Sequence, residues 1–237
     1  MKVYLNREPV SGPWGGGNKI IQKLDASLRQ DGHKVVYKLN APNIDVIFCQ
    51  DPRPNKYGEW YQHILSYKNK FKTKVIQRVG DVGSHGKPEL TDLLKQVCYL
   101  SDHVVFTSEW AKNYLQYNED NSTVLHNAPV KDFYQFRNND NVDKVKLVTH
   151  HWSTNVRKGF DLYQQLDKFL ESNPQWEFTY IGSLPKNVKL KNSKYLSATG
   201  DNALMSKVIS DNTIYLTASE EEAGANHVLE GMAAGLP

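Results

Sequence analysis

The sequence predicts an α/β protein built on two parallel β-sheets, and two observations lead to this fold class. Short apolar runs of strand length alternate with segments of helical periodicity along most of the chain. The alternation stops in a polar, Asn-rich stretch at residues 132–143 and then starts again. Strands joined by helices of this length predict parallel sheets covered on both faces. We therefore expect a first domain at residues 1–131, a linker at 132–143 and a second domain at 144–237.

The first domain opens with an expected strand at residues 2–6 and a loop rich in Gly and Pro. A helix follows, because Ile20, Ile21, Leu24 and Leu28 lie at helical spacing, and Asp31-Gly32 ends it. The other elements rest on the same criteria. They are strands at 33–39, 45–49, 74–79, 103–107 and 123–126, and helices at 59–71, 88–99 and 108–117.

The second domain repeats the alternation over residues 144–237. Its last element is a helix that ends just before Pro237, so no strand follows it in this sequence. The expected strands lie at 144–149, 176–181, 195–198 and 212–217, and the expected helices at 159–171, 203–210 and 226–234.

The composition excludes several classes of protein. The chain has 237 residues and a formal net charge of only +3, which does not favour a protein that binds nucleic acid through counterion release. Cys49 and Cys98 lie in apolar runs and are expected to be reduced core thiols of a cytoplasmic protein. No apolar stretch approaches the roughly 18 residues of a membrane span.

A basic run is the strongest local charge feature. Lys68, Lys70, Lys72 and Lys74 occupy every second position. One interpretation is a solvated edge or loop. The other is a patch for an anionic substrate or a lipid headgroup, which would attach the protein to the surface of a membrane.

The first candidate site is the Gly-rich turn after the first strand, Gly15-Gly16-Gly17-Asn18. Such a turn lets the backbone approach a ligand and directs helix-end amides at an anion. A dinucleotide site would also need an acidic residue at the end of the second strand. That strand ends Val36-Tyr-Lys-Leu-Asn-Ala-Pro without a carboxylate, which argues against NAD.

The second candidate is the loop between the first strand and first helix of the second domain, which contains Arg157 and Lys158. Doubly wound domains bind ligands at such loops. Two cations beside a helix N-terminus suit a diphosphate. An ordinary solvated basic loop is the alternative.

The third and most informative candidate places Glu222 in a loop and Glu230 in the first turns of the last helix. Both carboxylates can face one crevice and accept hydrogen bonds from the vicinal hydroxyls of a sugar or ribose. The amides of Ala225 and Asn226 would add an anion-binding helix end. The alternative is that the acidic run only matches the helix dipole.

Together these stretches resemble the retaining glycosyltransferases of family 4, which have the GT-B fold of two facing Rossmann-like domains. The resemblance covers nearly the whole chain, and its last motif is the most specific. The matching segments are Gly15-Gly-Gly, Asp31-Gly-His-Lys-Val, Ser101-Asp-His-Val-Val-Phe-Thr-Ser, Leu125-His-Asn-Ala-Pro, Lys158-Gly-Phe-Asp, and Glu222 with Glu230 followed by Gly-Met-Ala-Ala-Gly-Leu-Pro.

The resemblance implies roles for individual residues. Lys158 would hold the donor diphosphate, Glu222 would contact the transferred sugar and Glu230 the nucleotide ribose. The other implied contacts are with Gly16 and Gly17 near the donor phosphates and the acceptor, and with the backbone of Asn226 and His227 at the sugar.

Two departures from the family pattern are visible. Many members carry an Arg where this chain has Ser153, and Arg157 is the candidate for the missing charge. The sugar-side His-Asp motif of the first domain is replaced by a stretch that leaves Asp81, with His85 nearby.

No divalent metal or other cofactor is expected. The sequence has no Asp-x-Asp motif, and the adjacent His150 and His151 lack partners at metal-ligand spacing. The expected reaction is transfer of a sugar from a UDP- or GDP-sugar to a glycan or lipid acceptor. Two alternatives stay open: a GT-B sugar-nucleotide epimerase, and a non-catalytic partner protein that binds nucleotide sugars.

The family plan also changes how the length is interpreted. When the chain is compared with the two-domain plan of a GT-B enzyme, we expect the first domain to be whole and the second to be partial. The second domain would need roughly another hundred residues to reach a usual size. The chain would then be a fragment of a longer enzyme or a shortened enzyme that needs a partner.

Overall fold

The computed structural model describes residues 1–12, 15–134 and 144–237. The chain divides into two compact units. Unit 1 comprises Met1–Ser11 and Gly16–His126, and unit 2 comprises Asn127–Pro237 with the segment Gly12–Gly15. Each unit is an α/β structure with one parallel sheet, of six strands in unit 1 and four in unit 2.

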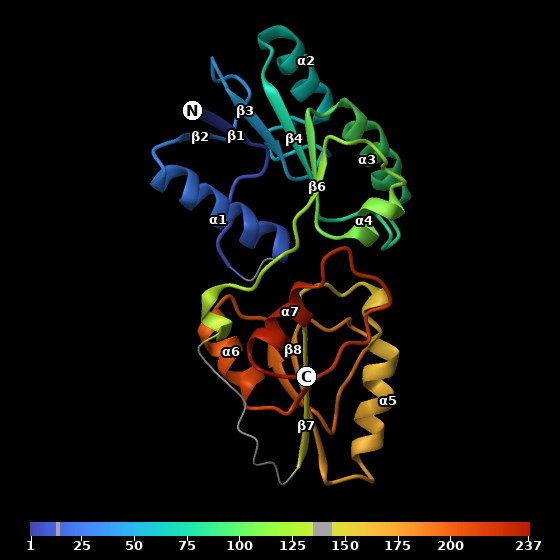
Figure 1. Cartoon of the computed structure of the whole chain (residues 1–237). Helices are drawn as coiled ribbons and strands as arrows, with labels where there is room; N and C mark the ends of the chain where they lie inside the picture. Colours follow the sequence, from blue (N-terminus) through green and yellow to red (C-terminus); the bar gives the residue numbers. More distant parts are fainter. Residues whose placement is uncertain (13–14, 135–143) are drawn as a thin grey trace. The chain divides into compact units, whose positions relative to one another are not determined.

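The sheet of unit 1 has the strand order β2-β1-β3-β4-β5-β6, with every neighbouring pair parallel. Figure 1 shows α1 on one side of this sheet and α2 and α3 on the other, as in a doubly wound fold. The strands are β1 Lys2–Leu5, β2 Lys34–Val36, β3 Val46–Cys49, β4 Lys74–Val79, β5 His103–Phe106 and β6 Ser122–Val124. The helices are α1 Gly16–Gln30, α2 Tyr61–Phe71, α3 Pro88–Leu100 and α4 Glu109–Tyr114.

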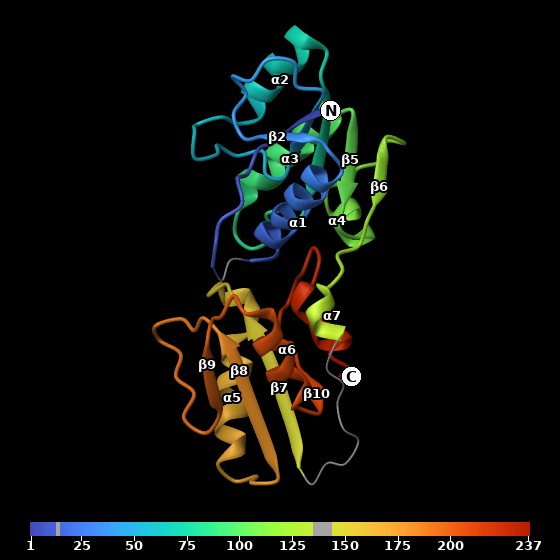
Figure 2. The same cartoon turned by 90° about the vertical axis from the view of Figure 1, so that its left-hand side faces the viewer.

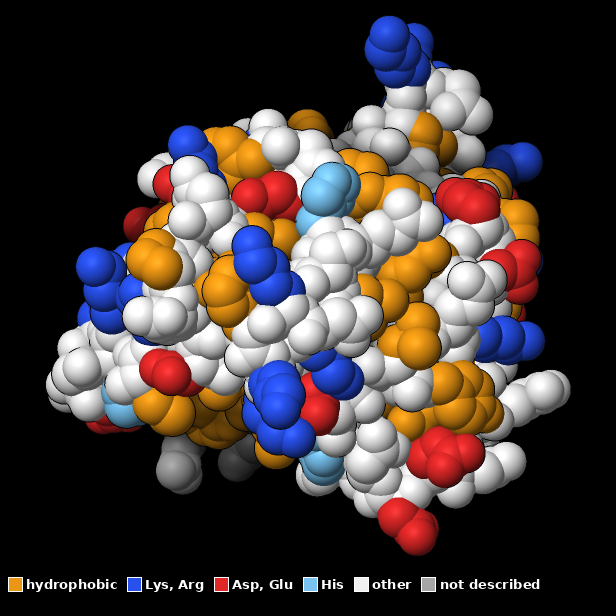
Figure 3. Space-filling model, turned by 90° about the horizontal axis from the view of Figure 1, so that it is seen from above, with side chains coloured by type: hydrophobic (Ala, Val, Ile, Leu, Met, Phe, Trp, Pro, Cys, Tyr) orange, Lys and Arg blue, Asp and Glu red, His pale blue; other side chains and the backbone are white. Residues whose placement is uncertain are grey.

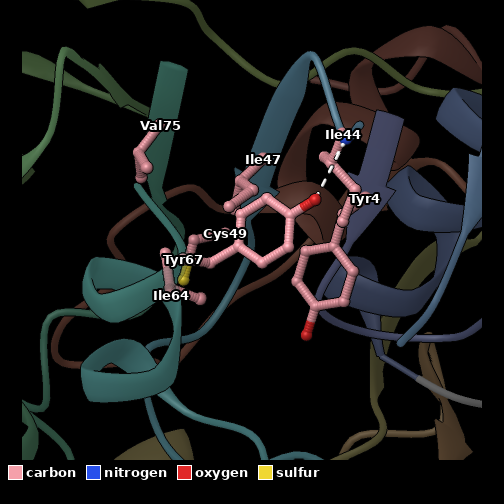
Figure 4. Close-up of a cluster of buried hydrophobic side chains, with 7 residues drawn as sticks. All are labelled: Tyr4, Ile44, Ile47, Cys49, Ile64, Tyr67 and Val75. Atoms are coloured by element: carbon pink, nitrogen blue, oxygen red, sulfur yellow. Dashed lines mark hydrogen bonds between the residues drawn. The ribbon is translucent and has the colours of Figure 1, made fainter. Parts of the chain in front are cut away.

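Alternation along β1 divides the core of unit 1 between the two faces of the sheet. Val3 and Leu5 pack with Ile21 of α1 on one face. Tyr4 points to the opposite face and packs in a cluster with Ile64 of α2 (Figure 4). Successive strand residues point to opposite faces, so a strand covered on both sides must be apolar throughout. This explains the continuous apolar runs in the sequence.

The sheet of unit 2 has the order β10-β7-β8-β9, again with parallel pairs only. Figure 1 shows α5 and α6 on opposite sides of this sheet, and Figure 2 shows its strands side by side. The strands are β7 Val145–His151, β8 Trp176–Gly182, β9 Lys194–Ser197 and β10 Ile214–Tyr215. The helices are α5 Phe160–Leu170, α6 Asn202–Ser210 and α7 Asn226–Ala233, with the short 3-10 helices η1 Lys131–Tyr134 and η2 Val156–Lys158.

Several elements are shorter than the sequence predicted. β2 and β10 lie at sheet edges and pair with only one neighbour each, so only part of each apolar run is hydrogen-bonded as a strand. α4 begins where the side chain of Ser108 accepts a hydrogen bond from the Ala111 amide at 3.1 Å. It ends before Gln116, whose φ of 56° is left-handed and cannot continue a helix.

The start of the expected linker lies in the core of unit 2. Phe133 of η1 is fully buried against Ile209 of α6 and Leu236, so the chain groups with unit 2 from Asn127 onward. The rest of the expected linker, residues 135–143, lies outside the described residues.

The basic run spans the end of α2 and the start of β4. Lys68 and Lys74 both pair with Asp102, at 2.9 and 3.1 Å. Lys72 is the left-handed C-cap of α2, and Lys70 lies over the ring of Phe71. Figure 3 shows the side chains of Lys and Arg interspersed with acidic and hydrophobic ones on the face seen from above. Within the described residues, no helix has both the length and the apolar character that crossing a bilayer requires.

Tyr67 offers a test of the unit 1 core. Its buried hydroxyl accepts a hydrogen bond from the Ile44 amide at 3.1 Å and donates one to the Ala41 carbonyl at 2.9 Å. Tyr67→Phe leaves both backbone groups without this partner, so we expect a loss of about 1 to 3 kcal/mol in the free energy of unfolding. Denaturant titration measures it. Tyr99→Phe, at a residue 54% exposed, is the matched control, and an equal loss in both variants would contradict the assignment.

Candidate functional site

Polar side chains gather at the carboxyl-terminal edge of the unit 2 sheet. Two loops meet there: residues 152–159 after β7, and residues 216–225 after β10. β7 and β10 are neighbours, and the strand order reverses between them because β7 is followed by β8 on its other side. The crevice outside such a reversal is where doubly wound sheets bind ligands.

The first pair at this edge is formed by Lys158 and Glu222. The ammonium nitrogen Nζ of Lys158 donates a hydrogen bond to the carboxylate oxygen Oε1 of Glu222. The two side chains are only 11% and 21% exposed. Burial works to raise the pKa of the Glu222 carboxyl, but the charge and hydrogen bond of Lys158 outweigh it and hold that pKa below its usual range. Glu222 is therefore a carboxylate at neutral pH.

The backbones of the two loops are tied together beside this pair. The Glu220 amide donates to the Arg157 carbonyl at 3.0 Å. Gly159, with a φ of +72°, follows Lys158, and a Cβ there would lie 2.3 Å from the Ala218 carbonyl oxygen. Only glycine allows both this left-handed turn and this approach. The loop contact thus sets the position of Lys158 relative to Glu222.

His227, in the first turn of α7, lies beside Glu222. Its Nε2 is 3.0 Å from the Thr217 hydroxyl, and its Nδ1 is 3.9 Å from Glu222 Oε1. Burial lowers the pKa of His227 to about 4, although Glu222 works to raise it. The imidazole is neutral at pH 7, so Lys158 rather than His227 supplies positive charge here.

Glu230, one turn further along α7, is held from the sheet. The Nε2 atom of His150 lies 2.7 Å from Glu230 Oε2, and the Nδ1 atom lies 2.8 Å from the Tyr215 hydroxyl. The side chains of His150 and Glu230 are 1% and 5% exposed. Glu230 is therefore a buried carboxylate whose orientation depends on β7 and β10.

His151 occupies the opposite face of β7. Its Nε2 lies 2.8 Å from the Tyr163 hydroxyl, which also accepts a hydrogen bond from the Ala218 amide at 2.9 Å. Burial lowers the pKa of His151 to about 2, so this imidazole is neutral. The Tyr163 hydroxyl thus ties α5 both to β7, through His151, and to the loop after β10, through the Ala218 amide.

The structure brings together four of the residues named from the sequence: Lys158, Glu222, His227 and Glu230. Asn226 begins α7, and its amide donates to the Gly224 carbonyl at 2.8 Å.

Arg157 and Ser153 lie toward solvent in the loop after β7. Arg157 pairs with Glu221 at 3.0 Å, and the two side chains are 39% and 33% exposed. The hydroxyl of Ser153 accepts a hydrogen bond from the Asn155 amide at 3.1 Å. In this arrangement the Arg157 charge is directed at a carboxylate of the other loop.

The remaining predicted residues belong to unit 1. Gly16 and Gly17 form the first turn of α1. Asp81 follows β4 and pairs with Lys87 at 2.8 Å. Desolvation works to raise the pKa of the Asp81 carboxyl, but the hydrogen bonds from Lys87 and the Gly83 amide, with the nearby positive charges, together lower it. His85 lies half-buried in the same loop.

Four residues of the unit 2 site were not named as site residues from the sequence: His150, His151, Tyr163 and Tyr215. From the sequence, His150 and His151 were considered only as metal ligands. Their position at the end of a buried parallel strand is the signal that could have identified them as site residues. Tyr163 and Tyr215 look like ordinary core residues of a helix and a strand.

Among the described residues, no group of three or more His, Cys, Asp or Glu side chains is arranged to hold a metal ion.

Comparisons with solved structures identify the fold. The chain superposes over its whole length on HepE from Anabaena, crystallised with UDP and glucose, with a TM-score of 0.70 at 12% identity and 79% of that chain covered. The fold is that of the GT-B glycosyltransferases. WaaG, a glycosyltransferase involved in lipopolysaccharide biosynthesis, gives a TM-score of 0.64 at 13% identity over 100% of this chain and 80% of that one.

A third solved structure is the lipopolysaccharide outer core galactosyltransferase WaaB, in its apo form. It gives a TM-score of 0.67 at 11% identity over 100% of this chain and 79% of that one. No family model matches the sequence. No curated protein matches it either. At these identities the likeness establishes the fold alone.

The neutral histidines predict how stability depends on pH. The folded-state pKa values of His151 and His227, about 2 and about 4, lie below the ordinary 6.5. Unfolding therefore takes up protons, and stability that is complete above pH 6.5 is lost as the pH falls. Each histidine contributes a slope of up to about 1.4 kcal/mol per pH unit. Denaturant unfolding between pH 7 and pH 5, followed by circular dichroism, measures the slope.

His151→Gln should reduce that slope by the equivalent of about one proton. His63→Gln, at an exposed position in α2, should leave it unchanged. An unchanged slope in His151→Gln would show that His151 is not the buried neutral group.

Proposed function

We propose that the protein is a retaining glycosyltransferase of the hexosyltransferase type. It would move a sugar from a UDP- or GDP-sugar to a glycan or lipid acceptor without a divalent metal. The observation that carries the proposal is one sheet edge of unit 2, at the reversal of strand order, where the largely buried cation Lys158 pairs with Glu222. At the same edge a second carboxylate, Glu230, is held by His150.

These residue types match the parts of a nucleotide sugar. Lys158 is the group for the diphosphate, whose negative charge grows as the sugar departs. Glu230 accepts hydrogen bonds from the vicinal hydroxyls of the ribose, and Glu222 from those of the sugar. Support comes from the fold shared with HepE, which was crystallised with UDP and glucose.

In the proposed reaction, the bond between the anomeric carbon and the diphosphate oxygen breaks through an oxocarbenium-like state. The acceptor hydroxyl attacks from the same face, and its proton passes to the departing phosphate oxygen. Lys158 supplies the positive charge that stabilises the leaving group, because the imidazoles of His151 and His227 are neutral at pH 7. Glu222 is ionised and can hold the sugar hydroxyls.

The other predicted contacts stay proposals. They are Ser153, Arg157, Asn226 and His227 for the donor, Gly16 and Gly17 for the donor phosphates and the acceptor, and Asp81 and His85 for the acceptor or sugar side. We also propose a cytoplasmic location, in keeping with the buried free thiols of Cys49 and Cys98. A lipid contact through the basic run would rely on Lys70 and Lys72, since Lys68 and Lys74 pair with Asp102.

Substitution of Lys158 tests the phosphate role. Lys158→Ala should lower turnover on the order of a hundredfold or more, because one preorganised charge at the leaving group is lost. Sugar transfer or donor hydrolysis at saturating donor measures it. Lys144→Ala, which breaks an exposed ion pair with Glu177 just before β7, is the matched control and should keep full turnover. Equal turnover in both variants would remove Lys158 from the mechanism.

A thermal-shift panel of nucleotide sugars tests the donor site and its base. We expect stabilisation of the wild type by one nucleotide class, by about 2.7 kcal/mol at a ligand concentration of a hundred times Kd. The shift should be lost in Glu230→Ala. Product analysis without acceptor then separates a transferase from an epimerase, and binding without hydrolysis or transfer would indicate a non-catalytic protein.

A further inference from the structure

We propose that His150 is a positioning residue that holds the Glu230 carboxylate in the orientation needed for a nucleotide ribose, and that Tyr215 fixes the proton on the imidazole. This inference rests on the proposed function, because it gives Glu230 the ribose as its ligand. It concerns two residues that act through Glu230: His150 contacts the Glu230 carboxylate, and Tyr215 contacts His150.

The three side chains form one chain of hydrogen bonds at the end of β7. The His150 ring lies between the Tyr215 hydroxyl, 2.8 Å from Nδ1, and the Glu230 carboxylate, 2.7 Å from Nε2. The Tyr215 hydroxyl also accepts a hydrogen bond from the His150 backbone amide at 3.2 Å. Both ring nitrogens of His150 are therefore in use.

The direction of these hydrogen bonds follows from the donors available. Burial raises the pKa of the Tyr215 hydroxyl well above its usual value, so the hydroxyl keeps its proton. Because its oxygen already accepts from the amide, its proton can be donated to His150 Nδ1. An imidazole that accepts at Nδ1 carries its proton at Nε2, which then donates to Glu230.

The ring of Tyr215 is itself fixed by packing against α7. A Cβ at Gly231 would lie 2.3 Å from the Tyr215 ring, so the ring occupies the space that a side chain at this position would need. Gly231 directly follows Glu230. The same turn of α7 therefore supplies the carboxylate and the surface that positions the hydroxyl at the other end of the chain.

A buried carboxylate needs this support for two reasons. Its lost solvation is replaced by hydrogen bonds, which are stronger than ordinary ones when the acceptor is charged. The terminal torsion of a Glu side chain has a broad energy profile, so one fixed oxygen determines where the other points. Recognition of two adjacent hydroxyls depends on that direction.

Two substitutions of His150 separate positioning from general loss of structure. The amide nitrogen of His150→Gln can reach the place of Nε2 and donate to Glu230. His150→Asn places its amide where Nδ1 was, so it can still meet Tyr215 but does not reach Glu230. Both variants are polar and remove the imidazole.

Calorimetric titration with UDP and with 2′-deoxy-UDP, or with GDP and 2′-deoxy-GDP if the wild type takes guanine, gives the readout. We expect the wild type to prefer the ribonucleotide. His150→Asn should raise Kd about tenfold and reduce the preference to within about twofold, as expected for loss of an orienting hydrogen bond. His150→Gln should keep most of both.

If His150→Asn does not fold, Tyr215→Phe replaces it, with Tyr180→Phe as matched control. Tyr180 is a fully buried strand tyrosine of the same unit, and its hydroxyl donates to the Ser183 carbonyl at 2.9 Å rather than to a histidine. Tyr215→Phe should weaken the ribose preference and Tyr180→Phe should not. The role of His150 is overturned if the wild type prefers the ribonucleotide and His150→Asn, or Tyr215→Phe in its place, keeps the same preference. A wild type that binds neither nucleotide overturns the proposed function instead.

Discussion

The backbone contact between the two loops at the unit 2 sheet edge is the constraint on which the site depends. The Glu220 amide bonds the Arg157 carbonyl, and Gly159 lies against the Ala218 carbonyl. The Tyr163 hydroxyl fixes the same loop to α5 through the Ala218 amide. Because these groups are backbone atoms or deeply buried, the two loops are held in a fixed position relative to each other. This fixed position brings Lys158 and Glu222 into contact.

Much of this arrangement could be predicted from the sequence, because the relevant signals are local. Apolar runs and helical periodicity gave two alternating series, and parallel strands bring their carboxyl ends to one edge. Lys158 after the first strand and Glu222 after the last therefore had to meet at the same edge. The spacing of Glu230 from Glu222 placed the second carboxylate in the adjoining helix.

The rest could not be predicted because it depends on contacts between distant positions. His150 meets Tyr215 across 65 residues and Glu230 across 80, and nothing in the local pattern around Tyr215 distinguishes it from a core residue. The ion pair of Arg157 with Glu221 likewise joins two loops, so the direction of the Arg157 side chain had no local signal. Phe133 looked like part of a polar linker, yet it completes the unit 2 core.

The close fit of Gly231 to the Tyr215 ring has a consequence for how such a chain can change over evolution. A methyl group at position 231 would require a smaller residue at position 215, and a smaller residue there would no longer present a hydroxyl to His150. Variation at the two positions is therefore coupled, and a substitution in the core would change the orientation of Glu230 without replacing any residue that contacts it. Paired changes at 215 and 231 in related chains would be the signature of this coupling.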